Sequence, residues 1–130
     1  MKELTQITDL QLEIMDVLWA RGEATVAEVH GALAEQTGRA RKTIGTLLAR
    51  LEKQGMLAHR EEGREFIYRA TVPRSAVAQA TVDNLVSRVF RGDVAAMVSH
   101  ALEAGEVREG DVERIRELLA RWTPGQEENP

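Results

Sequence analysis

The sequence predicts a mainly α fold with a small β-hairpin wing: a winged helix-turn-helix domain followed by a C-terminal three-helix dimerisation region. Apolar residues recur at helical spacing through most of the chain. Two short strand-like segments flank a glycine turn, and aromatic residues make up only 4%, which disfavours a β-sandwich. We expect a winged domain over residues 1–72, a helical dimerisation domain over 73–123 and a disordered tail over 124–130.

The first two helices carry the same N-terminal signal. The first is expected to begin at Thr8, where Gln11 three residues later completes a capping box. Its apolar residues lie on two nearly opposite faces, so it must be covered on both sides. The second is expected to begin at Thr25 with Glu28 as its partner, and to close at Gly38.

The third helix is expected from about Ala40 to Gln54, with Gly55 as its left-handed terminator. One face is an apolar stripe made of Ile44, Leu47, Leu48 and Leu51. The opposite face carries Lys42, Gly45, Thr46, Ala49, Arg50 and Lys53. The two faces predict a helix with one side in the core and the other available to a partner.

The second of these faces is typical of a helix that enters the major groove of DNA. The small Gly45 would allow close approach to base edges, and Thr46 offers a hydroxyl or a methyl group. A glycine inside a helix costs about 1 kcal/mol relative to alanine, which indicates a packing or approach constraint unless it is tolerated drift. Predicted DNA contacts on this helix are Arg41, Lys42, Thr43, Gly45, Thr46, Arg50 and Lys53.

A hairpin is expected to follow, with strands over 56–61 and 65–70 around Glu62-Gly63-Arg64. Arg60 and Arg64 near its tip would reach phosphates or the minor groove. Residues 39–69 hold eight basic and four acidic residues, a net +4, whereas the rest holds nine basic and 17 acidic. The basic residues alone would fit a solvated helix face, but the adjoining hairpin favours DNA binding.

Other classes of function lack their motifs. The chain has no cysteine, so disulfides and thiol chemistry are excluded. Three scattered histidines have no metal-ligand spacing, and the run before Thr43 lacks the glycines of a phosphate loop. No stretch approaches the roughly 18 apolar residues that span a bilayer, and no signal peptide is evident. We therefore expect a cytoplasmic protein that is not an enzyme, with no metal or cofactor and no membrane partner.

Beyond Pro73, three helices are expected: one ending at Gly92, one capped by Asp93 and one near the C-terminus. Their thin apolar stripes cannot bury themselves well, so we expect pairing with a second copy, the alternative being packing against the chain's own winged domain. Predicted dimer contacts are Val77, Val82, Leu85, Val86, Val89, Met97, Leu102, Ile115, Leu118, Leu119 and Trp122.

Five segments together resemble the BlaI/MecI/CopY (penicillinase repressor) family of winged-helix regulators. Residues 7–19 resemble its opening helix, 25–29 its second helix, 42–55 its recognition helix, 66–68 the end of its wing and 107–119 its last helix. The resemblance implies a dimeric bacterial repressor that binds inverted-repeat operators in double-stranded DNA, often with TACA/TGTA half-sites, and blocks resistance or stress genes.

The resemblance also bears on single residues. Thr43, Thr46 and Arg50 match positions that the family uses for DNA contact, whereas Lys42 and Gly45 differ from many members. The β-lactam repressors are inactivated by cleavage at an Asn-Phe bond, but this chain reads Ser-His-Ala-Leu over 99–102 and lacks the cysteine motif of the copper-responsive branch. A regulatory protease therefore remains unidentified, and an adjacent gene for a membrane metalloprotease would restore that mode of induction.

Two alternatives stay open from the sequence. A winged helix can also serve as a protein–protein assembly module without DNA. A regulator that senses a small molecule beside Trp19 or Trp122 is the other, although no polar cluster converges on either side chain.

Overall fold

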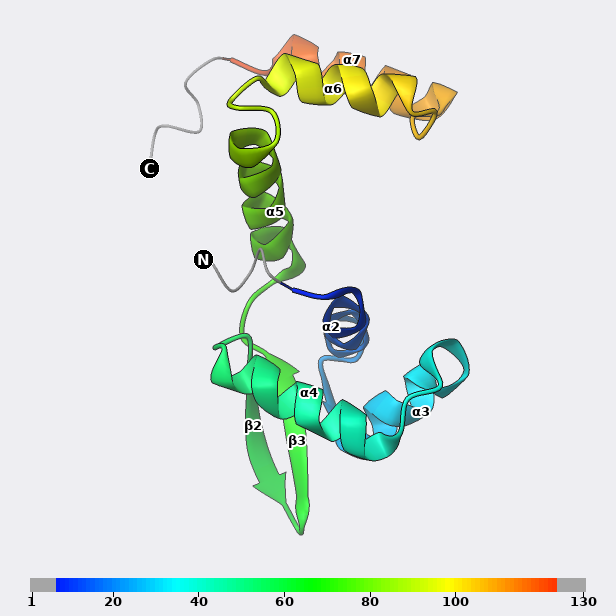
Figure 1. Ribbon diagram of the computed structural model, residues 1–130, viewed down its shortest axis with the longest axis vertical. Coiled ribbons are helices and arrows are strands. Elements are labelled where there is room, and N and C mark those ends of the chain that lie inside the picture. Colours follow the sequence, from blue (N-terminus) through cyan, green and yellow to red (C-terminus); the bar gives the residue numbers. More distant parts are fainter. Residues whose placement is uncertain (1–6, 124–130) are drawn as a thin grey trace. The chain divides into compact units, whose positions relative to one another are not determined.

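The computed structural model describes residues 7–123, which form two compact units divided between Asn84 and Leu85 (Figure 1). The elements are α2 (Asp9–Arg21), β1 (Glu23–Thr25), α3 (Val26–Thr37), α4 (Arg41–Lys53), β2 (Leu57–Glu62), β3 (Glu65–Ala70), α5 (Arg74–Arg88), α6 (Val94–Glu103) and α7 (Glu109–Arg121). The mainly helical fold with a hairpin wing is confirmed. The expected disordered tail lies outside the described residues.

Both predicted capping boxes are present. The Thr8 hydroxyl accepts the Gln11 backbone N–H at 3.1 Å, and the Gln11 side chain accepts the Thr8 N–H at 3.0 Å. Thr25 and Glu28 make the same pair of bonds at 3.1 and 2.8 Å. Each box satisfies two backbone donors that a helix N-terminus leaves unpaired, so it fixes where α2 and α3 begin.

The end of α4 is a Schellman motif. The N–H of Gly55 bonds to the Glu52 carbonyl at 2.9 Å, and that of Met56 to the Leu51 carbonyl at 3.0 Å. Gly55 has a φ of +85°, which residues with a side chain rarely adopt. The predicted terminator is confirmed, and it turns the chain from α4 directly into β2.

The wing belongs to a three-stranded antiparallel sheet with strand order β1-β3-β2. The short strand β1 was missed, because three residues carry no alternating pattern; it pairs along the second edge of β3, with Glu23 opposite Arg69. The turn is also tighter than predicted. Glu62 pairs with Glu65, so only Gly63 and Arg64 form the loop.

The core of the first unit gathers apolar side chains from α2, β1, α3, α4, β2, β3 and α5. Its members are Ile14, Met15, Leu18, Ala24, Val29, Leu33, Ile44, Leu48, Leu51, Met56, Leu57, Tyr68 and Val77. The prediction of Val77 as a dimer contact is wrong. Its side chain is 5% exposed and packs in this core, and Ala76 and Ala80 pack against the same cluster. The first turns of α5 therefore belong to the winged unit.

The second unit consists of the end of α5, α6 and α7. Asp93 caps α6 as predicted, accepting the Ala96 N–H at 2.9 Å. Helix α5 ends at Arg88 rather than at Gly92, because Arg91 and Gly92 both take positive φ values in the turn before α6. No residue between 85 and 123 is buried, so this unit has no closed core of its own.

Candidate nucleic-acid interface

Helix α4 separates into a buried face and an exposed face. Ile44, Leu48 and Leu51 are 0% exposed and pack in the core. The exposed residues of the helix are Arg41, Lys42, Thr43, Thr46, Ala49, Arg50 and Lys53. The expected division of the helix is confirmed, whereas contact of these side chains with DNA stays a prediction.

The exposed face of α4 carries positive charge without a competing free carboxylate. Its cations are Arg41, Lys42, Arg50 and Lys53, and none makes an ion pair with any residue between 7 and 123. The helix has one acidic residue, Glu52, whose carboxylate is bonded to a histidine of β2. The face is therefore purely cationic, which favours a polyanionic partner.

Thr46 lies in the middle of this face. Its hydroxyl donates a 3.0 Å hydrogen bond to the Lys42 carbonyl one turn earlier. The hydroxyl hydrogen is therefore already used within the helix. The methyl group and the oxygen lone pairs remain available to a base edge, where a thymine methyl would be a suitable neighbour.

Gly45 lies at the edge of the exposed face, next to α3. A Cβ built on it would be 3.6 Å from Cγ1 of Val26, an ordinary van der Waals distance. An alanine would thus fit without displacing the neighbouring helix, so packing alone does not require glycine here. A longer side chain at this position would extend beside Val26.

The two wing arginines differ in their partners. Arg60 pairs with Glu62 on its own strand, and its Nη2 lies 2.8 Å from Oε1 of Glu23 in β1. The hydrogen bonds from Glu62 and Glu23 raise the pKa of the Arg60 guanidinium. Arg64 sits at the turn beside Gly63 and has no ion pair among the described residues. Arg64 is therefore free to meet a phosphate, whereas Arg60 is already occupied.

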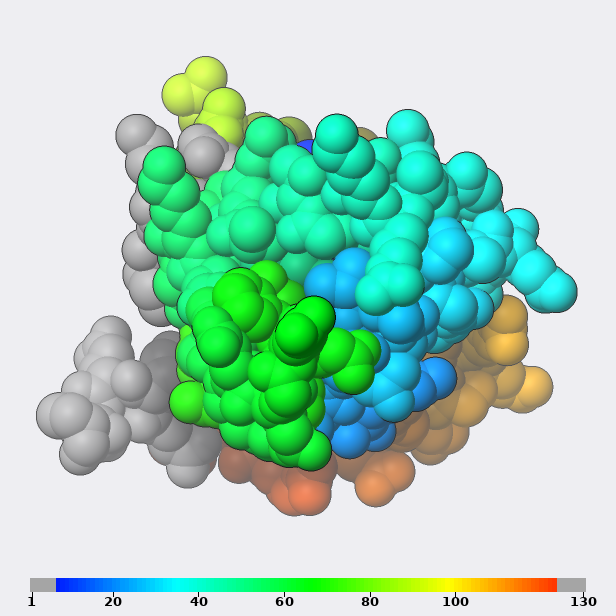
Figure 2. Space-filling model, turned by 90° about the horizontal axis from the view of Figure 1, so that it is seen from below, coloured from blue at the N-terminus to red at the C-terminus, as the bar shows by residue number. Residues whose placement is uncertain are grey.

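The helix and the wing meet at a shallow pocket. Its lining residues are Thr25, Val26, Arg41, Arg64, Glu65 and Phe66. Arg41 at the N-terminus of α4 and Arg64 at the wing tip, 23 residues apart in sequence, thus border one hollow. Seen from the wing side, the hairpin, α4 and α3 lie next to one another on one face (Figure 2). Two arginines that border the same hollow can contact the same phosphate backbone.

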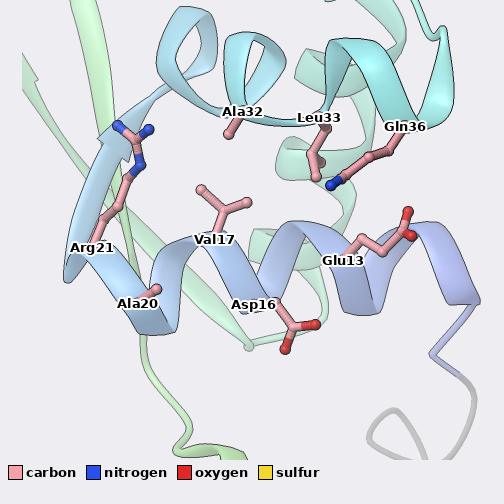
Figure 3. Close-up of a pocket in the computed structure, with 8 residues that line it drawn as sticks. All are labelled: Glu13, Asp16, Val17, Ala20, Arg21, Ala32, Leu33 and Gln36. Carbon is pink, nitrogen blue, oxygen red and sulfur yellow. The ribbon is translucent and has the colours of Figure 1, made fainter.

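A second pocket, between α2 and α3, has the wrong chemistry for DNA. Figure 3 shows Val17 and Leu33 pointing toward one another across its floor, with Glu13 at one end and Arg21 at the other. Asp16 also lines it and points away from α3 (Figure 3). Acidic groups at the rim repel phosphate, so the cationic face of α4 is the better nucleic-acid surface.

Sequence reasoning missed the partner of Glu52. His59 lies in β2, within the strand expected over residues 56–61, but its contact with Glu52 joins a helix to a strand seven residues later. No local pattern signals such a pair, because it depends on how sharply the chain turns at Gly55. Among residues 7–123 no cluster of three metal-ligating side chains forms, and no helix is long and apolar enough to cross a membrane.

The predicted dimer contacts beyond Val77 are distributed over α5, α6 and α7. Their most exposed members are Leu119 at 69%, Val89 at 64% and Leu118 at 55%. Val82, Leu85, Leu102 and Trp122 are also exposed, whereas Val86, Met97 and Ile115 are partly buried. In other proteins, exposed apolar surfaces of this kind mark sites of contact with a partner.

Comparison with known proteins agrees with this geometry. A family model described as the penicillinase repressor matches residues 7–121. The penicillinase repressor of Bacillus licheniformis is 31% identical over 119 residues, covering 92% of this chain and 93% of that protein. The transcriptional regulator BlaI of Mycobacterium tuberculosis is 33% identical over 132 aligned positions. The match covers 100% of this chain and 94% of that protein.

Solved structures are similar in the winged unit. The DNA binding domain of the repressor BlaI is 40% identical, with a TM-score of 0.51, covering 58% of this chain and 92% of that domain. The antimony-specific transcriptional repressor AntR shows the same fold, with 20% identity and a TM-score of 0.51. The match covers 65% of this chain and 72% of the AntR chain. With a family model over almost all described residues and two relatives above 30% identity over nearly full length, this chain belongs to the penicillinase repressor family.

Proposed function

We propose that this chain is a cytoplasmic transcriptional repressor that binds an inverted-repeat operator as a homodimer. The observation that carries the proposal is the exposed face of α4. It presents small side chains beside the wing and four cations that make no ion pair with any residue between 7 and 123. The names of its relatives, a penicillinase repressor and the DNA binding domain of a repressor, support the same function.

In this proposal α4 enters the major groove, which is wide enough to admit one α-helix. Thr46 and Arg50, one turn apart on its exposed face, read base edges. Lys42, Lys53 and Arg64 contact phosphates and hold the helix in register. Phosphate contacts supply most of the affinity, and the base contacts supply the sequence preference.

The second unit supplies the dimer. Its helices leave Leu118, Leu119 and Trp122 of one apolar stripe at least half exposed, and nothing between residues 85 and 123 is buried. A second copy would cover both stripes at once, since a twofold interface matches a surface with itself. Two copies would then present two α4 helices to the two halves of a palindromic operator.

The test is a mobility-shift titration with the DNA upstream of the chain's own gene, against an unrelated duplex of equal length. Arg50→Ala should weaken specific binding by about 1–3 kcal/mol if Arg50 reads a base, or reduce the salt slope by about one if it binds phosphate. Arg121→Ala, an exposed arginine of α7, is the matched control and should change neither. Absence of any specific shift at moderate salt would indicate an assembly module instead of a repressor.

A further inference from the structure

One ion pair joins α4 to the wing. The Nδ1 of His59 in β2 lies 2.6 and 2.8 Å from the two carboxylate oxygens of Glu52 in the last turn of α4. A carboxylate accepts but does not donate, so Nδ1 carries the hydrogen. The side chains are 27% and 32% exposed, which keeps most of the contact away from solvent.

Aromatic rings of β3 hold the imidazole in place. The His59 ring stacks on Phe66 with centroids 3.9 Å apart and planes 12° apart, and the Tyr68 ring lies 5.6 Å away. Glu52 from α4 and Tyr68 from β3 are the titratable groups that face the imidazole. The neighbour on β2, Arg60, alternates to the other side of the sheet, where it pairs with Glu23 and Glu62.

We propose that Glu52 and His59 are positioning residues for DNA binding, which hold the wing at the angle where it and α4 engage the duplex together. The inference rests on the proposed function. The pair lies near the base of the hairpin, whereas Arg64 lies at its tip, so a small rotation at the pair displaces the tip further. Fixing that angle before binding lowers the ordering cost of association.

The bond between the two side chains has a carboxylate as its acceptor, which makes it charge-assisted. Removing either partner should free the hairpin, and the affinity for DNA should fall by about fivefold. The loss should come through the wing tip, so it should not add to the loss caused by Arg64→Ala.

The first experiment measures affinity for the duplex that the wild-type chain shifts, with and without Arg64→Ala. His59→Gln and Glu52→Gln should each bind about fivefold more weakly than the wild type. Adding Arg64→Ala to either should cost less affinity than Arg64→Ala costs alone, because the wing tip is already out of place. His30→Gln is the matched control, since His30 of α3 has no ring contact or ion pair within residues 7–123. It should bind as the wild type does and keep the full effect of Arg64→Ala. Thermal melts check that every variant is folded.

The second readout does not need DNA. Tyr68 is the single tyrosine of the chain, so fluorotyrosine labelling gives one ¹⁹F resonance beside His59. That resonance should move when His59→Gln or Glu52→Gln removes the pair, and it should keep its wild-type position in His30→Gln. If the wild type binds DNA and both pair variants bind equally well, or lose as much affinity as the wild type when Arg64→Ala is added, the inference fails and the proposed function stands. If the wild type binds no DNA, the proposed function fails as well.

Discussion

The indole N–H of Trp19 donates a 2.8 Å hydrogen bond to the backbone carbonyl of Val72, 53 residues further along the chain. The guanidinium carbon of Arg74 lies 4.7 Å from the centre of the same indole, and its Nη1 is 2.8 Å from Oδ1 of Asp16. Helix α2 therefore holds the residues on both sides of Pro73, and fixes the point at which α5 leaves the sheet.

Trp19→Phe keeps an aromatic side chain, although a smaller one, and removes the N–H donor. Because the Val72 carbonyl then loses its partner in a partly buried site, the free energy of unfolding should fall by about 1–2 kcal/mol, measured by urea denaturation. Trp122→Phe is the matched control, since Trp122 lies outside the core of the winged unit and its substitution should leave the unfolding of that unit unchanged. Equal effects of the two substitutions would show that the bond to Val72 contributes nothing.

The capping box of α3 predicts that the stability of the fold decreases in acid. The backbone N–H and then the hydroxyl of Thr25 hold the pKa of Glu28 below its ordinary value of 4.5. The stabilisation is thus present above about pH 4.5 and is lost as the pH falls through the lowered value. Melting temperatures measured from pH 6 to pH 3 should show this loss in the wild type. In Glu28→Gln, whose amide oxygen still accepts but does not titrate, this contribution should disappear from the pH profile.

Gly45 separates stability from DNA binding. Gly45→Ala should raise the free energy of unfolding by about 0.5–1 kcal/mol, because alanine favours the helix and its Cβ meets Val26 at an ordinary distance. If the glycine is kept for close approach to the groove, operator affinity should fall in the same variant. If the variant is more stable and binds the operator as tightly as the wild type, Gly45 is not part of the DNA interface.

Local signals in the sequence were sufficient for much of the fold. Thr8, Thr25 and Gly55 each mark a helix boundary through hydrogen bonds to residues three positions away, and all three boundaries are present as predicted. The cationic face of α4 also follows from helical spacing alone, because it needs only the position of each residue on one helix.

Features that depend on distant contacts were not predictable in the same way. Strand β1 exists only because β3 offers a free edge, and Val77 is buried only because α5 returns to the core. The apolar stripe that starts at Val77 looks continuous along the sequence, yet its first residue serves the winged unit. Likewise Arg60 is a surface arginine by pattern, and only the register of the sheet brings Glu23 within reach.

The pairing of Arg60 predicts that two carboxylates weaken its part in DNA binding. In Glu23→Gln/Glu62→Gln the guanidinium loses both charged partners, so operator binding should tighten and the salt slope should steepen by about one phosphate contact. Removing two negative charges also favours DNA in general. The triple variant that adds Arg60→Ala isolates the specific part: it should lose the extra slope. If the triple variant binds like the double one, Arg60 does not reach the DNA.

The exposed stripe of α7 predicts that dimerisation can be removed without unfolding the winged unit. Leu118 is 55% exposed on the same stripe as Leu119 and Trp122, so Leu118→Asp would place a charge inside the proposed interface. Burying an unpaired carboxylate is strongly unfavourable, and sedimentation should show a monomer with much weaker operator binding.

Ala120→Asp introduces the same charge on the opposite side of α7 and serves as the matched control. It should sediment and bind as the wild type does. Because no residue of 85–123 contributes to the core of the first unit, the melting transition of that unit should be the same in both variants. If the Leu118→Asp protein remains dimeric, the two copies contact each other through another surface. If the wild-type chain sediments as a monomer, the proposed binding to an inverted-repeat operator as a dimer is wrong.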